Sequence, residues 1–316
     1  MRKIQTLLIT IFAVISFAAV SVSAKTQDIQ IYTADNSKGN ITKESVEEAF
    51  KKAGFAIDGN NNMNTPFKKR FNSTWYETYR LLFVHNPELV AKLAKNYPSI
   101  GLISPLSTSV YSNDEKKTMN ISTLTLEGMS KITGIPTSNK DLQAIYAMMN
   151  NALKAALPNG HFQKLNYKIK KPSGPLVTTF VTEIEVEEGV DLDDARETFQ
   201  EELEGEIEPV GFIVAGFVDL NEEFRENGVN DYDFYDAYSI CKLEVIHPVS
   251  KTHPEVGAFA PCTLYMYKKK GEPETHMGFP SVQNWISSTD IEDDASLKPL
   301  LEAQKLLEDI ITEVSE

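Results

Sequence analysis

Two pairs of segments in this 316-residue chain repeat each other, and the repeat requires a fold built from two similar units. Segment 54–67 matches 211–224 at an offset of 157 residues, and segment 98–111 matches 254–267 at an offset of 156. Chance gives about one identity in fourteen positions. The identical pairs are Gly54/Gly211, Phe55/Phe212, Gly59/Gly216, Asn64/Asn221 and Phe67/Phe224, then Pro98/Pro254, Gly101/Gly257, Pro105/Pro261 and Tyr111/Tyr267. Because they keep their order, the sequence predicts a duplicated domain.

The apolar pattern predicts strands and helices in a similar order in both halves. The expected strands are 28–33, 76–84, 100–111, 119–124 and 181–186, and the expected helices follow Thr42 and Asn86 and span 141–157, 191–207 and the C-terminal stripe from Leu297 to Val314. Pro172, Gly174 and Pro175 are typical of a linker. We therefore expect a first domain at 25–165, a linker at 166–178 and a second domain at 179–316.

The first 24 residues are typical of an export signal. Arg2 and Lys3 precede an apolar run that ends at Val22-Ser23-Ala24, where small residues suit cleavage. The alternative is an uncleaved membrane anchor, because the run approaches the length of a bilayer span. The sequence thus predicts a periplasmic or secreted protein with no membrane contact after cleavage.

The chain is acidic, with a formal net charge of −14, which becomes −16 when a leader with two basic residues and no acidic ones is removed. Segment 183–208 holds thirteen carboxylates and one basic residue, Arg196. Nucleic acid is therefore an unsuitable partner, since phosphate binding needs clustered basic groups. A solvated helix face explains this segment more simply than a cation-binding patch.

The two cysteines, Cys241 and Cys262, both lie in the second half. A third match, at an offset of 159, pairs Tyr76–Tyr79 with Tyr235–Tyr238 and places Cys241 at the position of Leu82, while Cys262 corresponds to Leu106 at an offset of 156. Both cysteines are therefore expected in the core. A buried disulfide, two buried free thiols, and a metal or redox role all remain open.

Two hypotheses involve the histidines. A zinc site would combine Cys241, His247, His253 and Cys262, but their spacing matches no common zinc pattern, so no metal is expected. His85 precedes the step Asn86-Pro87, and His247 directly precedes Pro248, at comparable places in the two halves. The two histidines could form a pair across a pseudo-twofold axis. Polar packing residues at strand ends are the simpler explanation.

Several polar and aromatic residues of the first half are candidates for a ligand site. The segment Gly59–Asn64 is expected to be a loop whose amides could hold a small anion or a sugar hydroxyl, although turn chemistry alone explains such loops. The candidate ligand-binding residues are Asn62, Asn64, Tyr76, Tyr79, Asn86 and Ser104. The run Asp231–Asp236 lacks the spacing of a calcium loop and is expected to be a solvated loop.

The step Asn86-Pro87, followed by Pro98, Gly101 and Pro105 before a strand ending in Tyr111, resembles the domain-of-unknown-function 302 family. The resemblance covers 29–157 well and 181–311 less closely, because His247-Pro248 replaces Asn86-Pro87 and Ala260-Pro261 replaces the leucine-type step. It implies an α+β fold, a small sandwich similar to the TATA-binding-protein arrangement of strand, helix, four strands and helix. It implies no established chemistry.

The sequence contains none of the common catalytic motifs, such as G-x-S-x-G, H-E-x-x-H, C-x-x-C or a phosphate-binding loop. It cannot exclude a carboxylate pair, because the chain has 45 acidic residues. The favoured hypothesis is an exported, non-enzymatic binding module with an unknown small ligand or protein partner and no cofactor. The alternatives are a periplasmic hydrolase that uses carboxylates in a cleft between the copies, and a structural interaction module.

Overall fold

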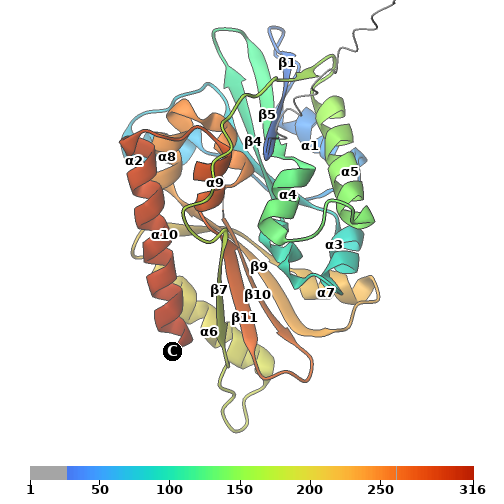
Figure 1. Cartoon of the computed structure of the whole chain (residues 1–316), viewed down its shortest axis with the longest axis vertical. Coiled ribbons are helices and arrows are strands. Elements are labelled where there is room, and N and C mark those ends of the chain that lie inside the picture. The colour runs from blue at the N-terminus through green and yellow to red at the C-terminus, as the bar shows by residue number, and fades with distance from the viewer. Residues whose placement is uncertain (1–26, 261) are drawn as a thin grey trace, which may run out of the picture.

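The computed structural model describes residues 27–260 and 262–316 (Figure 1). The predicted export signal at 1–24 and its cleavage site lie outside these residues. Within the described ranges, no helix combines the length and the apolar character that crossing a bilayer requires.

The first copy consists of a sheet, two longer helices (43–52 and 140–156) and several short helical segments. In chain order its elements are β1 (Ile29–Asp35), α1 (Lys43–Lys52), β2 (Ala56–Asn62), α2 (Asn64–Phe71), β3 (Tyr79–His85), α3 (Pro87–Ala94), η1 (Pro98–Ile103), β4 (Leu106–Asn113), β5 (Thr118–Leu124), α4 (Leu126–Thr133), α5 (Lys140–Ala156) and β6 (His161–Phe162). The helices begin where the sequence supplies caps: the Thr42 and Asn86 side chains accept hydrogen bonds from the first turns of α1 and α3.

The second copy repeats this order without a counterpart of β6. Its elements are β7 (Val177–Thr182), α6 (Leu192–Ile207), β8 (Phe212–Asp219), α7 (Leu220–Glu226), β9 (Tyr232–Lys242), α8 (Leu243–Thr252), η2 (Pro254–Ala258), β10 (Cys262–Lys269), β11 (Thr275–Pro280), α9 (Gln283–Ser288) and α10 (Asp294–Ser315). The predicted α+β class and duplication are therefore confirmed. Short helices α2, α3 and α4, and their counterparts, interrupt the simpler order that the family resemblance implied.

Both sheets are antiparallel and have equivalent strand orders. The first is β2-β3-β4-β5-β1-β6 and the second is β8-β9-β10-β11-β7. Edge strands β2 and β8 contact each other, and the Asn61 side chain donates a hydrogen bond to the Ala215 carbonyl at 3.3 Å. In the first copy the short strand β6 covers the outer edge of β1. In the second copy no described strand covers the outer edge of β7.

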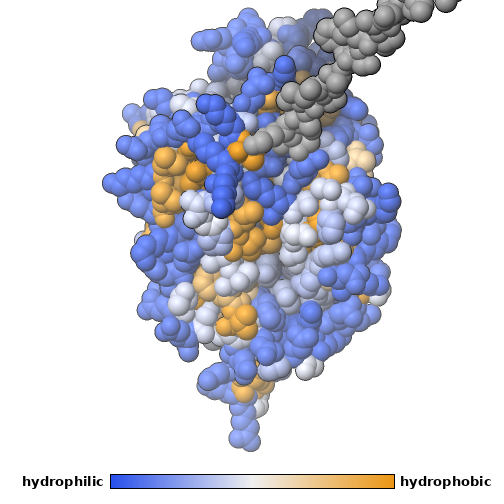
Figure 2. Space-filling view, viewed as in Figure 1, coloured by the Kyte–Doolittle hydropathy of each residue, from blue (hydrophilic) through white to orange (hydrophobic). Residues whose placement is uncertain are grey.

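Helices cover one face of each sheet. α5 packs with α1 and α3 in the first copy, and α10 packs with α6 and α8 in the second. Figure 1 shows α5 and α10 along opposite outer sides of the molecule. The surface is mostly hydrophilic, with scattered apolar patches (Figure 2). The buried residues of the two copies form one continuous hydrophobic cluster, so the copies share a core.

The repeated Pro-x-x-Gly segments lie at the interface between the copies. η1 of the first copy contacts β10 and β11, and η2 of the second contacts β4 and β5. A Cβ atom on Gly101 would lie 2.8 Å from Tyr265 Cβ, and one on Gly257 would lie 2.7 Å from Leu81 Cδ2. Only glycine permits this approach without a shift of the neighbours. The repeated motif therefore joins the two copies.

The predicted loop at Gly59–Asn64 is wrong, because 59–62 belong to strand β2. Gly59 lies opposite Phe83 beside an irregularity in the β2–β3 pairing, and an added Cβ atom would be 2.8 Å from the Phe83 ring. Gly216 lies at the same irregularity in the β8–β9 pairing. The repeated glycine marks a β-bulge, which the sequence pattern could not distinguish from a turn.

The register of the central strands corrects the third sequence match. Tyr79 pairs with Tyr111 on β4, and Tyr235 pairs with Tyr267 on β10, so Tyr79 and Tyr235 are equivalent and the offset is 156 for both strands of these pairs. On this register Cys241 corresponds to His85 and not to Leu82. The expected strand at 100–111 is also shorter, because η1 occupies its first part.

The acidic tyrosine run Asp231–Asp236 is not the expected solvated loop, because strand β9 begins at Tyr232. Asp236 is fully buried, and Gln200 of α6 donates a hydrogen bond to it at 2.8 Å. Arg196, the one basic residue of the acidic segment, places a guanidinium nitrogen 3.8 Å from the same carboxylate. The acidic helix α6 therefore reaches the sheet through Arg196 and Gln200.

Candidate functional site

The second copy contains an apolar cavity between its sheet and the helices α8, α9 and α10. Its volume is about 50 Å³. The lining is almost wholly apolar, and it includes both thiols. The lining residues are Phe212, Ile240, Cys241, Lys242, Val245, Ile246, Ala260, Cys262, Phe279, Val282, Trp285, Leu300, Ala303, Gln304 and Leu307. The two polar side chains of the lining are engaged in the fold: Lys242 donates to the Val210 carbonyl, and the Gln304 amide group binds Thr178 and Glu308. This second-copy cavity is therefore suited to a small apolar group, because a polar ligand would lose its hydrogen bonds to water there.

The repeat explains why the cavity is in the second copy. The buried residues of α5 include Leu142, Ile145, Met149 and Leu153, and those of α10 include Leu300, Ala303, Leu307 and Ile311, with the same spacing along the helix. Ala303 therefore takes the position of Ile145. The strand register likewise places Cys262 where the first copy has Leu106. Ala303 and Cys262 are smaller than Ile145 and Leu106, so they leave empty a volume that the larger side chains fill in the first copy.

Both cysteines are free thiols in the structure, so the disulfide that the sequence left open is not formed there. Cys262 lies opposite Ile240 in the strand pairing, which puts Cys241 one residue out of register on the adjacent strand. Burial raises the pKa of each thiol to about 12. Neither thiol is therefore an effective nucleophile near neutral pH, because the thiolate is the reactive form.

His85 binds two carboxylates, one from each copy. Its Nδ1 lies 2.7 Å from Asp58 Oδ2, and its Nε2 lies 2.6 Å from Glu223 Oε2 of α7. Burial lowers the pKa of His85, but the hydrogen bonds to Asp58 and Glu223 outweigh it and raise the pKa to about 9. The imidazolium form thus joins the copies, and both nitrogens are engaged. No motif or spacing in the sequence indicated Asp58 or Glu223.

His247 and His85 do not form the hypothetical pair, because their rings have separate partners. It lies inside helix α8, beyond the position equivalent to Asn86, which is Lys242. Its Nε2 is 3.0 Å from Ser73 Oγ, and its ring stacks on Phe71 with centroids 4.2 Å apart. His247 therefore contributes to packing between the copies.

An open cleft of about 640 Å³ brings His247 near His253 and Trp75. Two of its polar side chains already have partners: the Trp75 indole donates to the His247 carbonyl at 2.7 Å, and His253 Nδ1 is 3.1 Å from Glu255 Oε1. Neither cysteine lines this cleft. In the described part of the chain, no three His, Cys, Asp or Glu side chains are placed to hold a metal ion.

The candidate ligand residues of the first copy do not converge on one site. The Asn62 side chain accepts a hydrogen bond from the Asn64 amide at 3.1 Å, and the Asn64 side chain donates to the carbonyls of Tyr76 and Glu77. The Tyr76 hydroxyl donates to the Ser250 carbonyl at 3.0 Å. These contacts hold the loop before β3 against the second copy.

The other three candidates are also engaged in the fold. The buried Tyr79 hydroxyl donates to the Pro254 carbonyl at 3.3 Å. Asn86 accepts a hydrogen bond from the Leu89 amide and donates one to the Gly54 carbonyl. Ser104 is buried just after η1. None of the six candidates lines the second-copy cavity.

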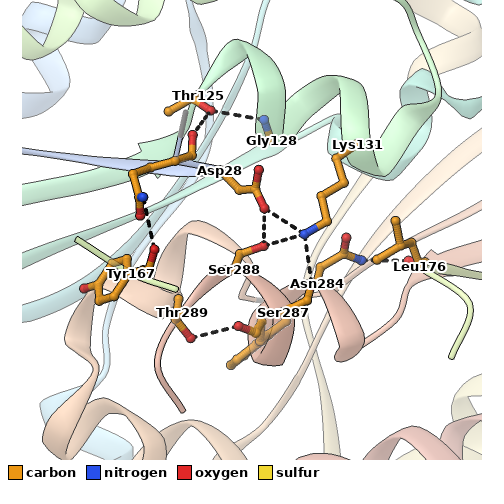
Figure 3. A network of polar contacts seen from close by, with 12 residues as sticks. Asp28, Thr125, Gly128, Lys131, Tyr167, Leu176, Asn284, Ser287, Ser288 and Thr289 are labelled. Carbon is orange, nitrogen blue, oxygen red and sulfur yellow. Dashed lines mark hydrogen bonds and ion pairs between the residues drawn. The ribbon is translucent and has the colours of Figure 1, made fainter. Parts of the chain in front are cut away.

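A network of a lysine, an aspartate and two serines is the arrangement nearest to catalytic machinery (Figure 3). Lys131 Nζ lies 2.7 Å from Asp28 Oδ2, 2.8 Å from Ser287 Oγ and 2.9 Å from Ser288 Oγ. Ser288 Oγ donates to the same aspartate at 2.7 Å. The three donors of the Lys131 ammonium group are used by these three oxygens, and the Ser288 hydroxyl proton is directed at Asp28. Lys131 therefore cannot activate Ser288, and the network instead joins α4 to α9.

Comparison with known proteins agrees with the duplication. The model of the family described as "Domain of unknown function DUF302" matches residues 33–156 and again 183–314. No curated protein matches the chain. A crystal structure of an uncharacterized conserved DUF302 protein from Bacillus stearothermophilus is 19% identical, and the match covers 44% of this chain and 98% of that one with a TM-score of 0.34. The chain belongs to the DUF302 family and carries two of its domains in tandem.

Proposed function

We propose that this protein is a non-enzymatic binding module, and that its second copy receives a small apolar ligand in the second-copy cavity. The observation that carries the proposal is the difference between the copies at one position of the core, Ala303 against Ile145. An empty cavity of about 50 Å³ costs a folded protein about 1 kcal/mol. A ligand that fills it would offset this cost.

The polar clusters of the molecule support binding over catalysis. Lys131 uses its three donors within its own network, and His85 uses both ring nitrogens. The thiols in the cavity are held in the neutral form, because burial raises the pKa of each to about 12. A hydrolase would need a free base or nucleophile at a cavity. The hydrolase alternative therefore has less support than a binding function.

Two variants that exchange the copies' residues test the proposal. Ala303→Ile gives the second copy the residue of the first, and Ile145→Ala opens the equivalent place in the first copy. Xenon, added under pressure, is expected to raise the melting temperature of the wild-type protein, because a small apolar ligand that binds the folded state stabilises it. Ala303→Ile should abolish this response.

Cys262→Leu provides a second filling variant in case isoleucine overpacks the site. Retention of the full xenon response in both filling variants would place the ligand elsewhere. No response from the wild-type protein, with Ile145→Ala responding, would show that the natural cavity is closed to such ligands. Either result contradicts the proposal.

We also propose that the module works outside the cytoplasm, in the periplasm of a Gram-negative cell or as a secreted protein. The support is the charged and apolar pattern of 1–24 and its small residues at 22 and 24. Fractionation followed by intact mass measurement would test this. A mature protein that begins at Lys25 is expected, whereas a full-length cytoplasmic chain would contradict export.

A further inference from the structure

We propose that the outer edge of β7, with the groove beside it, is a docking site for an extended basic segment of a partner protein. Strand β7 pairs with β11 on one side. On its other side, no backbone hydrogen bond to Val177–Thr182 is present within the described residues. Such an edge presents unpaired N–H and C=O groups to an incoming strand.

The first copy shows how the same edge is covered. There, β6 pairs antiparallel with β1 through Tyr32 and Thr33, and the Gln163 amide donates to the Ile31 carbonyl at 2.9 Å. β1 and β7 hold the same place in their sheets. The second copy lacks a counterpart of β6, so the position of an added strand is open.

A groove of about 590 Å³ continues from the end of β7 along α6 and the end of α10. Its apolar lining residues are Ile184, Val190, Phe199 and Val314, and its acidic ones are Glu183, Glu185, Glu187, Glu202, Glu313 and Glu316. The side chain of Val181 on the strand itself is 56% exposed. Apolar contacts on a strand edge with acidic groups around them suit a segment in which apolar and basic residues alternate.

The charge of this region favours a basic segment of a partner protein over a second copy of this chain. The glutamates that line the groove form no ion pair within the described residues. Pairing of β7 with β7 of a second chain would bring two such acidic segments together, which like-charge repulsion opposes. Arg196 cannot compensate, since it is directed at Asp236 and Asp193. A basic partner removes this repulsion.

Fluorescence anisotropy with synthetic peptides tests the docking site on the full chain. The probe is a labelled ten-residue peptide of alternating lysine and valine, and the comparison peptides are glutamate–valine and a lysine–valine peptide N-methylated at alternate residues. The first should bind at least tenfold more tightly than either of the others, because the glutamate peptide is repelled and N-methylation removes strand hydrogen bonds. Its affinity should fall with added salt.

The double variant Glu183→Lys/Glu185→Lys should lose binding, whereas Glu197→Lys/Glu206→Lys, with the same charge change on the part of α6 outside the groove, should keep most of it. Equal binding of the N-methylated peptide would show attraction by charge alone and overturn strand addition. Sedimentation of the unliganded protein as a dimer that Val181→Lys dissociates would assign the edge to a second copy of this chain, and would also overturn the proposal.

Discussion

Tyr79 and Tyr235 occupy equivalent positions in the two copies, and each donates its hydroxyl to the first carbonyl of the other copy's 3-10 turn. Tyr79 binds the Pro254 carbonyl, and Tyr235 binds the Pro98 carbonyl. Both side chains are buried. Tyr235 also accepts a hydrogen bond from the Gly101 amide at 3.1 Å. The reciprocal contacts relate the copies by a pseudo-twofold axis. The Tyr235 hydroxyl makes two of these hydrogen bonds, whereas the Tyr79 hydroxyl makes one.

Replacing either tyrosine with phenylalanine should therefore destabilise the protein, and Tyr235→Phe should cost more. Loss of a buried hydrogen bond that leaves its partner unsatisfied costs about 1–3 kcal/mol. Urea unfolding would measure the difference. Tyr146→Phe is the control, because this partly exposed hydroxyl contacts only the Gln30 side chain. A smaller cost for Tyr235→Phe than for Tyr146→Phe would show that the turn contacts contribute little.

Gly101→Ala should destabilise the protein by about 1–3 kcal/mol, as overpacking does in a tight core, since the new methyl group meets Tyr265 on the other copy. Gly257→Ala should act similarly through Leu81 and Ser109. The control is Gly205→Ala in helix α6, where nothing lies within 4 Å of an added Cβ atom. That change should stabilise the helix by about 0.5–1 kcal/mol. Thermal unfolding of the three variants measures the contrast.

The sequence predicted the duplication, the class of fold and the approximate boundaries of α1, α3, α5, α6 and α10, because these depend on local spacing and capping. It did not predict α2, α4, α7, α8 and α9. Thr42 and Asn86 could be identified as caps from the residues that follow them. The role of Gly101 could not be predicted, since its neighbours Tyr235 and Tyr265 come from the other copy. A short motif that repeats indicates a structural requirement, but its partner is visible only in three dimensions.

The candidate site was less predictable for a similar reason. The predicted alignment of Cys262 with Leu106 was correct. Ala303 could not be identified from the sequence, because a single alanine is common in an amphipathic helix. The cavity depends on how Ala303, Cys262 and Trp285 meet across three elements. The pairing of His85 with Asp58 and Glu223 likewise joins residues 27 and 138 positions away.

The His85 bridge should make stability depend on pH above neutrality. The folded-state pKa of about 9 lies above the ordinary value of 6.5, so the folded protein binds the proton more tightly than the unfolded chain. The stabilisation, of the order of 3 kcal/mol, is fully present below pH 6.5 and is lost as the pH rises through 9. Urea unfolding of the wild type and of His85→Gln should differ most at pH 6 and least near pH 10. A difference that does not narrow as the pH rises would contradict an imidazolium bridge.

Asp236 should also make stability fall as the pH rises, but in a lower range of pH than His85. Burial raises the pKa of this carboxyl to about 7 although Arg196 opposes the shift, so the folded protein binds its proton more tightly than the unfolded chain does. Ionisation therefore lowers stability as the pH rises from about 4 to 7. Asp236→Asn removes this ionisation and keeps the shape of the side chain.

Relative to the wild type, Asp236→Asn should be more stable at pH 8 than at pH 5, as measured by urea unfolding at both values. Asp233→Asn is the matched control, because Asp233 lies on the same strand, is only partly buried and pairs with Lys268 at 3.1 Å. Its effect should not follow the same pH range. An equal destabilisation of the protein by Asp236→Asn at both pH values would contradict this expectation. That result would show that Asp236 is ionised and paired with Arg196 at pH 5 as well as at pH 8, and that the attachment of α6 does not depend on protonation. A larger gain at pH 8 would show that the protonated carboxyl, with its hydrogen bond from Gln200, is the form that suits the buried position.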